Sequence, residues 1–228
     1  KGLYNDPGYC LGFYNCQYVT NCNASVTYTN ASALSIPTGY STCNYIVNCA
    51  ATVGGTTGSV YGFASCNRIN NCIGTSSATT GKAVGFYSCI QVDGCYASSS
   101  TNGAGCLSYG FDTCANMAAC NASCAANASS GGVSGFNACN YISGCDSTIV
   151  ATTNVVGYGF NSCRYISSCR ASATGNSNQN IIGFIICLQI VACSSIGTNA
   201  GAGTGYSYYN CTRMQQNRAE SFKTSAFL

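Results

Sequence analysis

Apolar residues recur at every third position in nine short stretches of this 228-residue chain. The first stretch contains, in order, Gly12, Phe13, Cys16, Val19 and Cys22. An uninterrupted strand would place inward residues at every second position, so the chain must bend between the apolar positions. The pattern predicts short strands separated by β-arcs, with aromatic, thiol, aliphatic and thiol side chains directed into one core.

The same motif returns with a nearly constant period. Between successive first cysteines the steps are 27, 23, 23, 25, 25, 24, 24 and 24 residues, and such a period is typical of solenoids. Eight copies are complete, and in the ninth Asn217 stands where the second cysteine belongs. The residues that represent the predicted inward ladders are Phe13, Cys16, Val19, Cys22, Cys43, Cys49, Cys66, Cys72, Cys89, Cys95, Cys114, Cys120, Cys139, Cys145, Cys163, Cys169, Cys187 and Cys193.

Composition decides which kind of solenoid this is. Helical repeats are longer and are rich in Ala, Leu, Glu, Lys and Arg. Only 6% of the residues in this chain are charged, which does not fit such a repeat. Gly, Ser, Thr, Asn and Ala fill the steps between motifs and favour turns and short strands. We therefore predict an all-β protein, a single parallel β-helix of about nine coils with Phe, Cys, Ile or Val, and Cys ladders inside. At about 4.8 Å per coil it would be a rod roughly 43 Å long.

A narrow inward corner is predicted just after the second cysteine. The residue two positions beyond that cysteine is small in every complete copy. These residues are Ala24, Ala51, Gly74, Ala97, Ala122, Ser147, Ala171 and Ser195.

The segment from Gly12 to Cys22 resembles the right-handed parallel β-helix repeat of the pectin-lyase-like superfamily, with cysteines at the Ser and Asn ladder positions. It is also similar to Cys-rich repeats of predicted bacteriophage tail-fibre proteins and bacterial surface proteins. The resemblance covers about residues 10–215 and implies a right-handed coil. Because the superfamily contains lyases, hydrolases, tailspikes and adhesins, it implies no single activity.

One continuous solenoid is one domain, because each coil buries its core only against its neighbours. We assign residues 12–211 to the β-helix and residues 1–11 to an N-terminal cap or linker with a turn at Asp6-Pro7-Gly8. Residues 212–228 lose the Gly and Ser richness and predict a short helix or extended arm, acting as a cap or a docking arm. The start at Lys1 rather than Met fits processing or excision from a longer protein.

Twenty cysteines would ordinarily indicate an oxidised, secreted scaffold. Disulfides within a coil require the chain to reverse between Cys16 and Cys22, but an inward Val19 would hold the two sulfurs apart. Like cysteines about 4.8 Å apart in neighbouring coils permit either free-thiol ladders or disulfides between coils. We favour reduced thiols packed as small apolar groups. We predict no metal site and no cofactor, because the Cys-x2-Cys spacing and histidine are both absent.

The carboxylates do not predict an enzyme. Glycoside hydrolysis needs two of them a few ångströms apart, and a lyase needs a base with basic or metal support. No two share a column of the repeat, so we expect isolated surface groups and no catalysis. The five are Asp6, Asp93, Asp112, Asp146 and Glu220.

A column of polar and aromatic residues lies two positions after the first cysteine, where alternation predicts exposure to solvent. It contains Tyr18, Tyr45, Arg68, Gln91, Asn116, Tyr141, Tyr165, Gln189 and Arg213. Tyrosine with Arg, Asn and Gln can stack on sugars and bind their hydroxyl groups. Contact with a neighbouring subunit, or a plain β-favouring surface, are the alternatives. The candidate contact residues are Tyr18, Tyr45, Arg68, Tyr141, Tyr165 and Arg213.

These observations favour a structural role outside the cell. A formal charge of +3, with its charged residues scattered, is too weak for binding nucleic acid. The chain contains no apolar run of 18 residues, so we expect no membrane insertion. We expect a non-catalytic protein of an extracellular fibre or filament, either a phage tail-fibre shaft or a secreted surface filament. It would lie extracellularly or on a virion surface and associate with itself or with neighbouring fibre subunits. The alternative is a carbohydrate-binding adhesin or receptor-binding module that recognises a cell-surface glycan.

Overall fold

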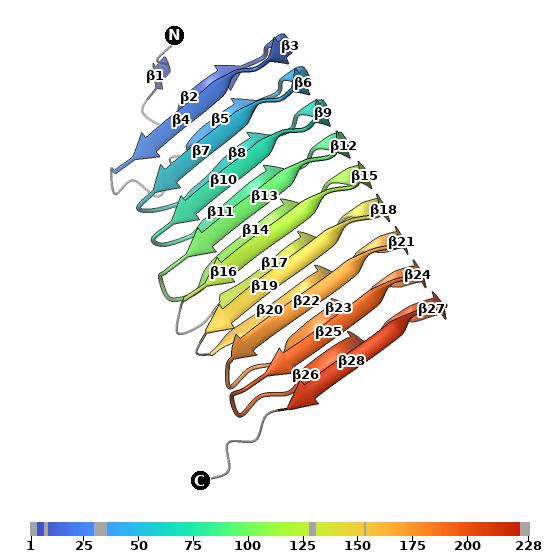
Figure 1. Ribbon diagram of the computed structural model, residues 1–228. Coiled ribbons are helices and arrows are strands. Elements are labelled where there is room, and N and C mark those ends of the chain that lie inside the picture. Colours follow the sequence, from blue (N-terminus) through green and yellow to red (C-terminus); the bar gives the residue numbers. More distant parts are fainter. Residues whose placement is uncertain (1–3, 7–8, 30–35, 128–130, 153, 224–228) are drawn as a thin grey trace.

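The computed structural model is a parallel β-solenoid whose described residues form 28 strands and no helix (Figure 1). The structure describes residues 4–6, 9–29, 36–127, 131–152 and 154–223. Three sheets, named A, B and C here, run along the molecule, and each coil adds one strand to each sheet. The predicted all-β parallel β-helix is thus confirmed. The stacked strands make about eight turns from the first to the last, slightly fewer than the nine coils predicted.

Each sheet holds nine parallel strands in the described residues, and sheet A also holds β1 (Tyr4–Asp6). The parallel strands of sheet A are β2 (Tyr9–Tyr14), β5 (Thr38–Ser41), β8 (Ser59–Ala64), β11 (Lys82–Tyr87), β14 (Cys106–Asp112), β17 (Gly131–Asn137), β20 (Val155–Asn161), β23 (Ile181–Ile185) and β26 (Gly205–Tyr209). Those of sheet B are β3 (Gln17–Thr20), β6 (Asn44–Val47), β9 (Asn67–Asn70), β12 (Ile90–Asp93), β15 (Ala115–Ala118), β18 (Asn140–Ser143), β21 (Arg164–Ser167), β24 (Leu188–Val191) and β27 (Thr212–Gln215). Those of sheet C are β4 (Asn23–Tyr28), β7 (Ala50–Gly55), β10 (Ile73–Ala78), β13 (Tyr96–Thr101), β16 (Asn121–Ala126), β19 (Asp146–Thr152), β22 (Arg170–Asn176), β25 (Ser194–Asn199) and β28 (Arg218–Lys223).

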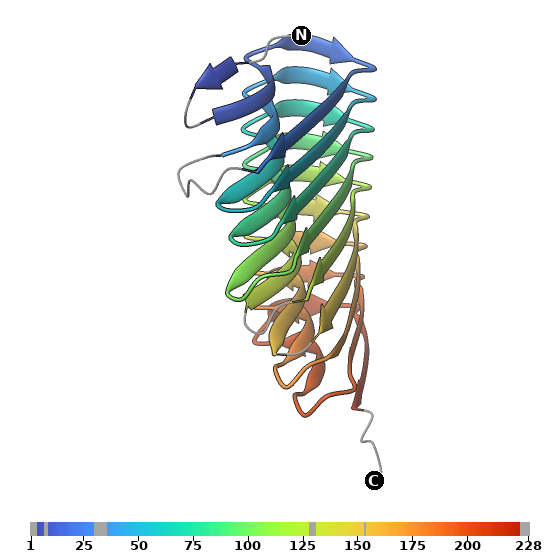
Figure 2. The same cartoon turned by 90° about the vertical axis from the view of Figure 1, so that its left-hand side faces the viewer.

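Strand β1, in blue, and strand β28, in red, lie at opposite ends of the column of coils (Figure 2). Strand β1 pairs antiparallel with β2, and residues 7–8 of the predicted turn lie outside the described residues. Strands β27 and β28 continue sheets B and C, so the described part of 212–228 is two further strands and not a short helix. Residues 224–228 lie outside the description, and capping or docking by either end stays a prediction.

Like residues face like residues because the coils stack in register. Phe136 pairs with Phe111 on one side and Phe160 on the other. The whole aromatic column, from Phe13 to Tyr208, is one continuous stack with ring centroids 4.6–5.1 Å apart. These separations match the spacing of parallel strands, so one ring per coil fills the core without gaps.

A left-handed backbone residue directly before the first cysteine, the aliphatic residue and the second cysteine of each motif explains the three-residue period. In the first coil Asn15, Tyr18 and Asn21 have φ of 52°, 54° and 52°, and the equivalent positions of the other coils repeat this conformation. Such a residue adds one outward position between two inward ones, which lengthens the inward interval from two residues to three. The bends inferred from the sequence are these left-handed residues.

The glycine that opens each motif faces the small residue after the second cysteine. A Cβ on Gly110 would lie 2.7 Å from Ala122 Cβ and 2.7 Å from the carbonyl oxygen of Gly135 in the next coil. Both distances are too short for a real side chain, so a glycine is needed where sheets A and C meet here. The narrow corner predicted from the small residues therefore lies against this glycine column.

The left-handed residues yield a stability prediction at Ala119, an exposed alanine with φ of 49° whose equivalents in the neighbouring coils are Gly94 and Gly144. Because glycine adopts this conformation without strain, Ala119→Gly should raise the free energy of unfolding by about 0.5–1 kcal/mol. The matched control is Ala118→Gly at the adjacent exposed strand position, which should lower it by about 0.5–1 kcal/mol. Denaturant unfolding of both variants checks this, and destabilisation by Ala119→Gly would contradict the assigned backbone.

Candidate functional site

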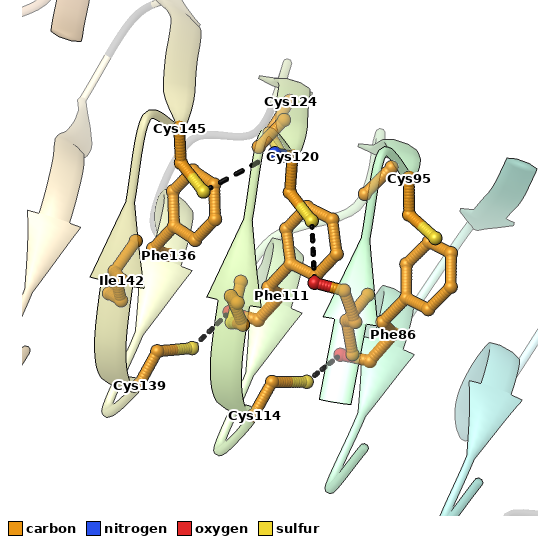
Figure 3. Packing of buried hydrophobic residues seen from close by; sticks show 14 of the residues in the cluster. Phe86, Cys95, Phe111, Cys114, Cys120, Cys124, Phe136, Cys139, Ile142 and Cys145 are labelled. Carbon is orange, nitrogen blue, oxygen red and sulfur yellow. Dashed lines mark hydrogen bonds between the residues drawn. The ribbon is translucent and has the colours of Figure 1, made fainter. Parts of the chain in front are cut away.

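The two cysteine columns form hydrogen-bonded ladders inside the core (Figure 3). The Cys139 thiol donates to the carbonyl oxygens of Asn137 at 3.2 Å and of Phe111, in the preceding coil, at 3.5 Å. First cysteines from Cys43 to Cys211 repeat the contact to the preceding coil at 3.4–3.8 Å. Each first-column thiol from Cys43 onward thus links two coils without a covalent bond.

The thiols of the second cysteine column both donate and accept hydrogen bonds. The Cys120 thiol donates to Ala118 and Val92, while the backbone N–H of Cys120 donates to Cys145 Sγ at 3.3 Å. In the last coil Asn217 takes over both roles, since its Oδ1 accepts from Cys193 N at 2.8 Å and its Nδ2 donates to Ile190 O at 3.0 Å. The column therefore requires a group that both accepts and donates, and Asn217 satisfies the requirement as cysteine does.

The structure places the predicted ladder residues in this core and holds all twenty cysteines as free thiols. Sixteen are buried, and Cys10, Cys16, Cys22 and Cys211 are half-buried. Desolvation raises the pKa of Cys139 and Cys163, and it raises the pKa of Cys124 to about 12. Hydrogen bonds from neighbouring thiols act in the opposite direction and lower the pKa of Cys66 and of Cys169 to about 4. Burial nevertheless shields the ladder thiols from reagents in solvent, so we expect them to act as packing groups.

The surface column predicted from the sequence lies at the middle of the sheet B strands. All nine residues have φ of 53–57°, so each side chain projects from a left-handed corner. Tyr18, Tyr141 and Tyr165 are 72%, 57% and 43% exposed. The predicted solvent exposure therefore holds for these tyrosines, while Tyr45 is half-buried.

Within this column the side chains contact one another along the rod. The Tyr18 and Tyr45 rings stack at 4.8 Å, and the Arg68 guanidinium lies 4.5 Å from the Tyr45 centroid. Tyr141 and Tyr165 form a second stacked pair at 4.7 Å. The stacking covers one face of each ring, so the column offers ring edges, hydroxyl groups and at most one face per tyrosine to a ligand. Arg213 is exposed at the last coil.

A charged pair on the outer side of sheet A was missed by sequence reasoning. Asp112 is only 2% exposed, so its assignment as an isolated surface carboxylate was wrong. One of its oxygens accepts from Lys82 Nζ, and the other accepts from Asn137 Nδ2 at 2.7 Å. Asn161 Nδ2 then donates to Asn137 Oδ1 at 2.8 Å, which extends the polar chain over three coils. No local sequence signal marks this pair, because it joins residues thirty positions apart.

Three other carboxylates have separate partners, while the side chain of Asp6 lies outside the description. Asp93 accepts from Asn70 at 3.4 Å, Asp146 lies 3.5 Å from Arg170, and Glu220 lies 2.7 Å from Arg218. Over the described ranges, no three Cys, Asp or Glu side chains gather in a way that could hold a metal ion. A cavity of about 230 Å³ on sheet C is lined by Arg170, Ser172, Ser194, Ile196, Arg218 and Glu220.

The thiol ladders yield a reactivity prediction. Alkylation of the native protein at mildly alkaline pH should modify at most Cys10, Cys16, Cys22 and Cys211, because the other sixteen are buried. In denaturant all twenty should react without prior reduction, and mass spectrometry of the alkylated protein gives the count. If reduction is needed before the ladder cysteines react in denaturant, the ladders are disulfides and the prediction is wrong.

The described residues include no helix long and apolar enough to cross a membrane. Comparison with known protein families, with curated proteins and with solved structures found no match for this chain.

Proposed function

We propose that the protein is a non-catalytic structural rod of an extracellular fibre or filament. The observation that carries the proposal is the unbroken continuity of three parallel sheets and of the aromatic and thiol ladders from coil to coil. A rod of this kind resists bending because deformation must break backbone hydrogen bonds in all three sheets at once.

Two further features support this role. Only 6% of the residues are charged, and hydroxyl and amide side chains dominate the turns. Such a surface is hydrated by its polar side chains without a strong electrostatic potential. The buried carboxylate, Asp112, has both oxygens occupied by Lys82 and Asn137, which favours a structural role over acid–base chemistry. The proposal includes the likeness to pectin-lyase-like β-helices and to Cys-rich tail-fibre and surface repeats, and a location on a virion or cell surface.

The proposed partners are further copies or neighbouring subunits of the same fibre. Within the described residues, β26, β27 and β28 each have a strand on one side only, as do β3 and β4 at the other end. Open strand edges pair readily with strands of another chain. Residues that continue these sheets would therefore extend the rod.

Negative-stain electron microscopy of the protein as isolated from its source tests the proposal. We expect rods joined end to end into filaments, or rods attached to a larger particle, since both arrangements use the solenoid as a spacer. A homogeneous population of single unattached rods about 40 Å long would contradict a role in a fibre.

A glycan-binding module is the second candidate, and the exposed Tyr141–Tyr165 pair is the observation that favours it. If this pair binds sugar, Tyr141→Ala with Tyr165→Ala should abolish retention on a glycan array, because the stacking surface is removed. Tyr96→Ala is the matched control, since Tyr96 is an exposed tyrosine on sheet C. Undiminished retention by the double variant would exclude this pair as a sugar site.

A further inference from the structure

The outer side of sheet A is bent into a concave surface. Lys82 pairs with Leu107 across the sheet, whereas Asp112 pairs with Tyr87, five positions further along the strand. A straight strand would separate these positions by roughly 16 Å, which is far beyond the reach of a lysine side chain. Lys82 nevertheless contacts Asp112, so the strands must curve toward solvent between them. The pairing skips Gly85, which places the bend at the glycine column.

Small or aliphatic residues form the floor of this concave surface. Val84, Ser134 and Ile182 are 0%, 1% and 2% exposed, although Val84 and Ile182 belong to neither interior cluster. The neighbouring position Ala83 does belong to an interior cluster, so alternation directs Val84 outward. These outward residues are therefore covered by side chains on the same outer face.

Tyrosine alternates with these residues along the same column. Register pairs Tyr61 with Val84 and Val84 with Tyr109. It continues through Ser134, Tyr158 and Ile182 to Tyr206. We name the four half-buried tyrosines the tyrosine stripe. It comprises Tyr61, Tyr109, Tyr158 and Tyr206.

The stripe has a repeat distance that differs from that of the sheet B column. Successive tyrosines are two coils apart, which is about 9.6 Å at the spacing of parallel strands. A polyproline II helix advances about 3.1 Å per residue with three residues per turn, so one turn covers about 9.3 Å. Over the three intervals of the stripe the mismatch accumulates to only about 1 Å. Every third residue of such a helix would therefore meet one tyrosine.

The charge and hydrogen-bonding capacity of this face also fit that partner. Lys82 and Asp112 neutralise each other, and Lys82 Nζ lies 5.0 Å from the ring centroids of both Tyr87 and Tyr109. Burial, with a further contribution from Asp112, raises the pKa of Tyr109 to about 12, so its hydroxyl group remains a donor. A polyproline II chain has unpaired backbone carbonyls and needs such donors, and Pro-rich segments dock on aromatic-lined surfaces.

We propose that the tyrosine stripe binds an uncharged, proline-rich segment in the polyproline II conformation, with one turn of the ligand for every two coils. The ligand axis runs along the rod, and tyrosine hydroxyl groups bind ligand carbonyls. The Tyr61 ring stacks on Tyr87 at 4.8 Å and the Tyr206 ring lies 5.3 Å from Tyr209, so prolines lie against the ring faces that these contacts leave open. This site does not depend on the proposed fibre role, since it requires only the register and curvature of sheet A.

Fluorescence anisotropy with labelled dodecaproline tests the proposal, with a labelled Gly-Ser peptide of equal length as the ligand control. The full-length protein should bind dodecaproline saturably and the control peptide not at all. Tyr109→Ala with Tyr158→Ala should weaken binding about tenfold or more, since two aromatic contacts are lost. The matched control, Tyr96→Ala at an exposed tyrosine on sheet C, should leave the affinity unchanged.

A second variant tests the spacing itself. Tyr109→Ser with Ser134→Tyr keeps the composition but shifts one ring by one coil, so it should weaken binding as the double alanine variant does. Circular dichroism shows whether either double variant is unfolded. If one is, the single substitution Tyr206→Ala at the last coil of the stripe replaces it. It should also weaken binding. Failure of dodecaproline to bind the unaltered protein, or an equal loss in the sheet C control, would overturn the proposal. Capture of neutral oligosaccharides by the stripe without dodecaproline would overturn it as well.

Discussion

The left-handed residue before each inward residue is the constraint on which the rest of this fold depends. Without it the segment from Phe13 to Cys22 would alternate, and Cys16 and Val19 could not both face the core. Left-handed backbone is unfavourable for most side chains, yet tyrosine, arginine and glutamine occupy it throughout sheet B. The stacked coils compensate for this local strain, because each inward residue gains a ring, methyl or thiol contact on both sides.

Stacking in register turns one local solution into a property of the whole molecule. A ring that fits between its neighbours fits at every coil, so the core is built from columns of similar side chains and not from a mixed interior. The same regularity handles polar groups, since the N–H of Cys120 finds an acceptor in the next coil. Each coil thereby satisfies backbone groups of its neighbour, and among the described residues only a few buried side-chain oxygens, such as Ser76 Oγ and Thr101 Oγ1, lack a partner.

The sequence was sufficient to predict the class of fold, the inward ladders and the narrow corner, because all three follow from residues within one repeat. It did not reveal the Lys82–Asp112 pair or the alternation of Tyr61, Val84 and Tyr109. Both depend on the bend of sheet A at Gly85 and on which residue of one coil faces which residue of the next. The repeat does align Tyr61, Val84 and Tyr109, because each directly precedes a motif glycine, but their outward and largely buried environment became visible only with the bend of the sheet.

The substitution of asparagine for the second cysteine in the last coil has a wider consequence. Asn217 cannot form a disulfide, yet it makes the same two kinds of contact as the cysteines of its column. The column is thus a hydrogen-bonding device and does not depend on oxidation. A core held in this way requires no disulfide, so the many cysteines of the chain do not by themselves indicate an oxidising compartment.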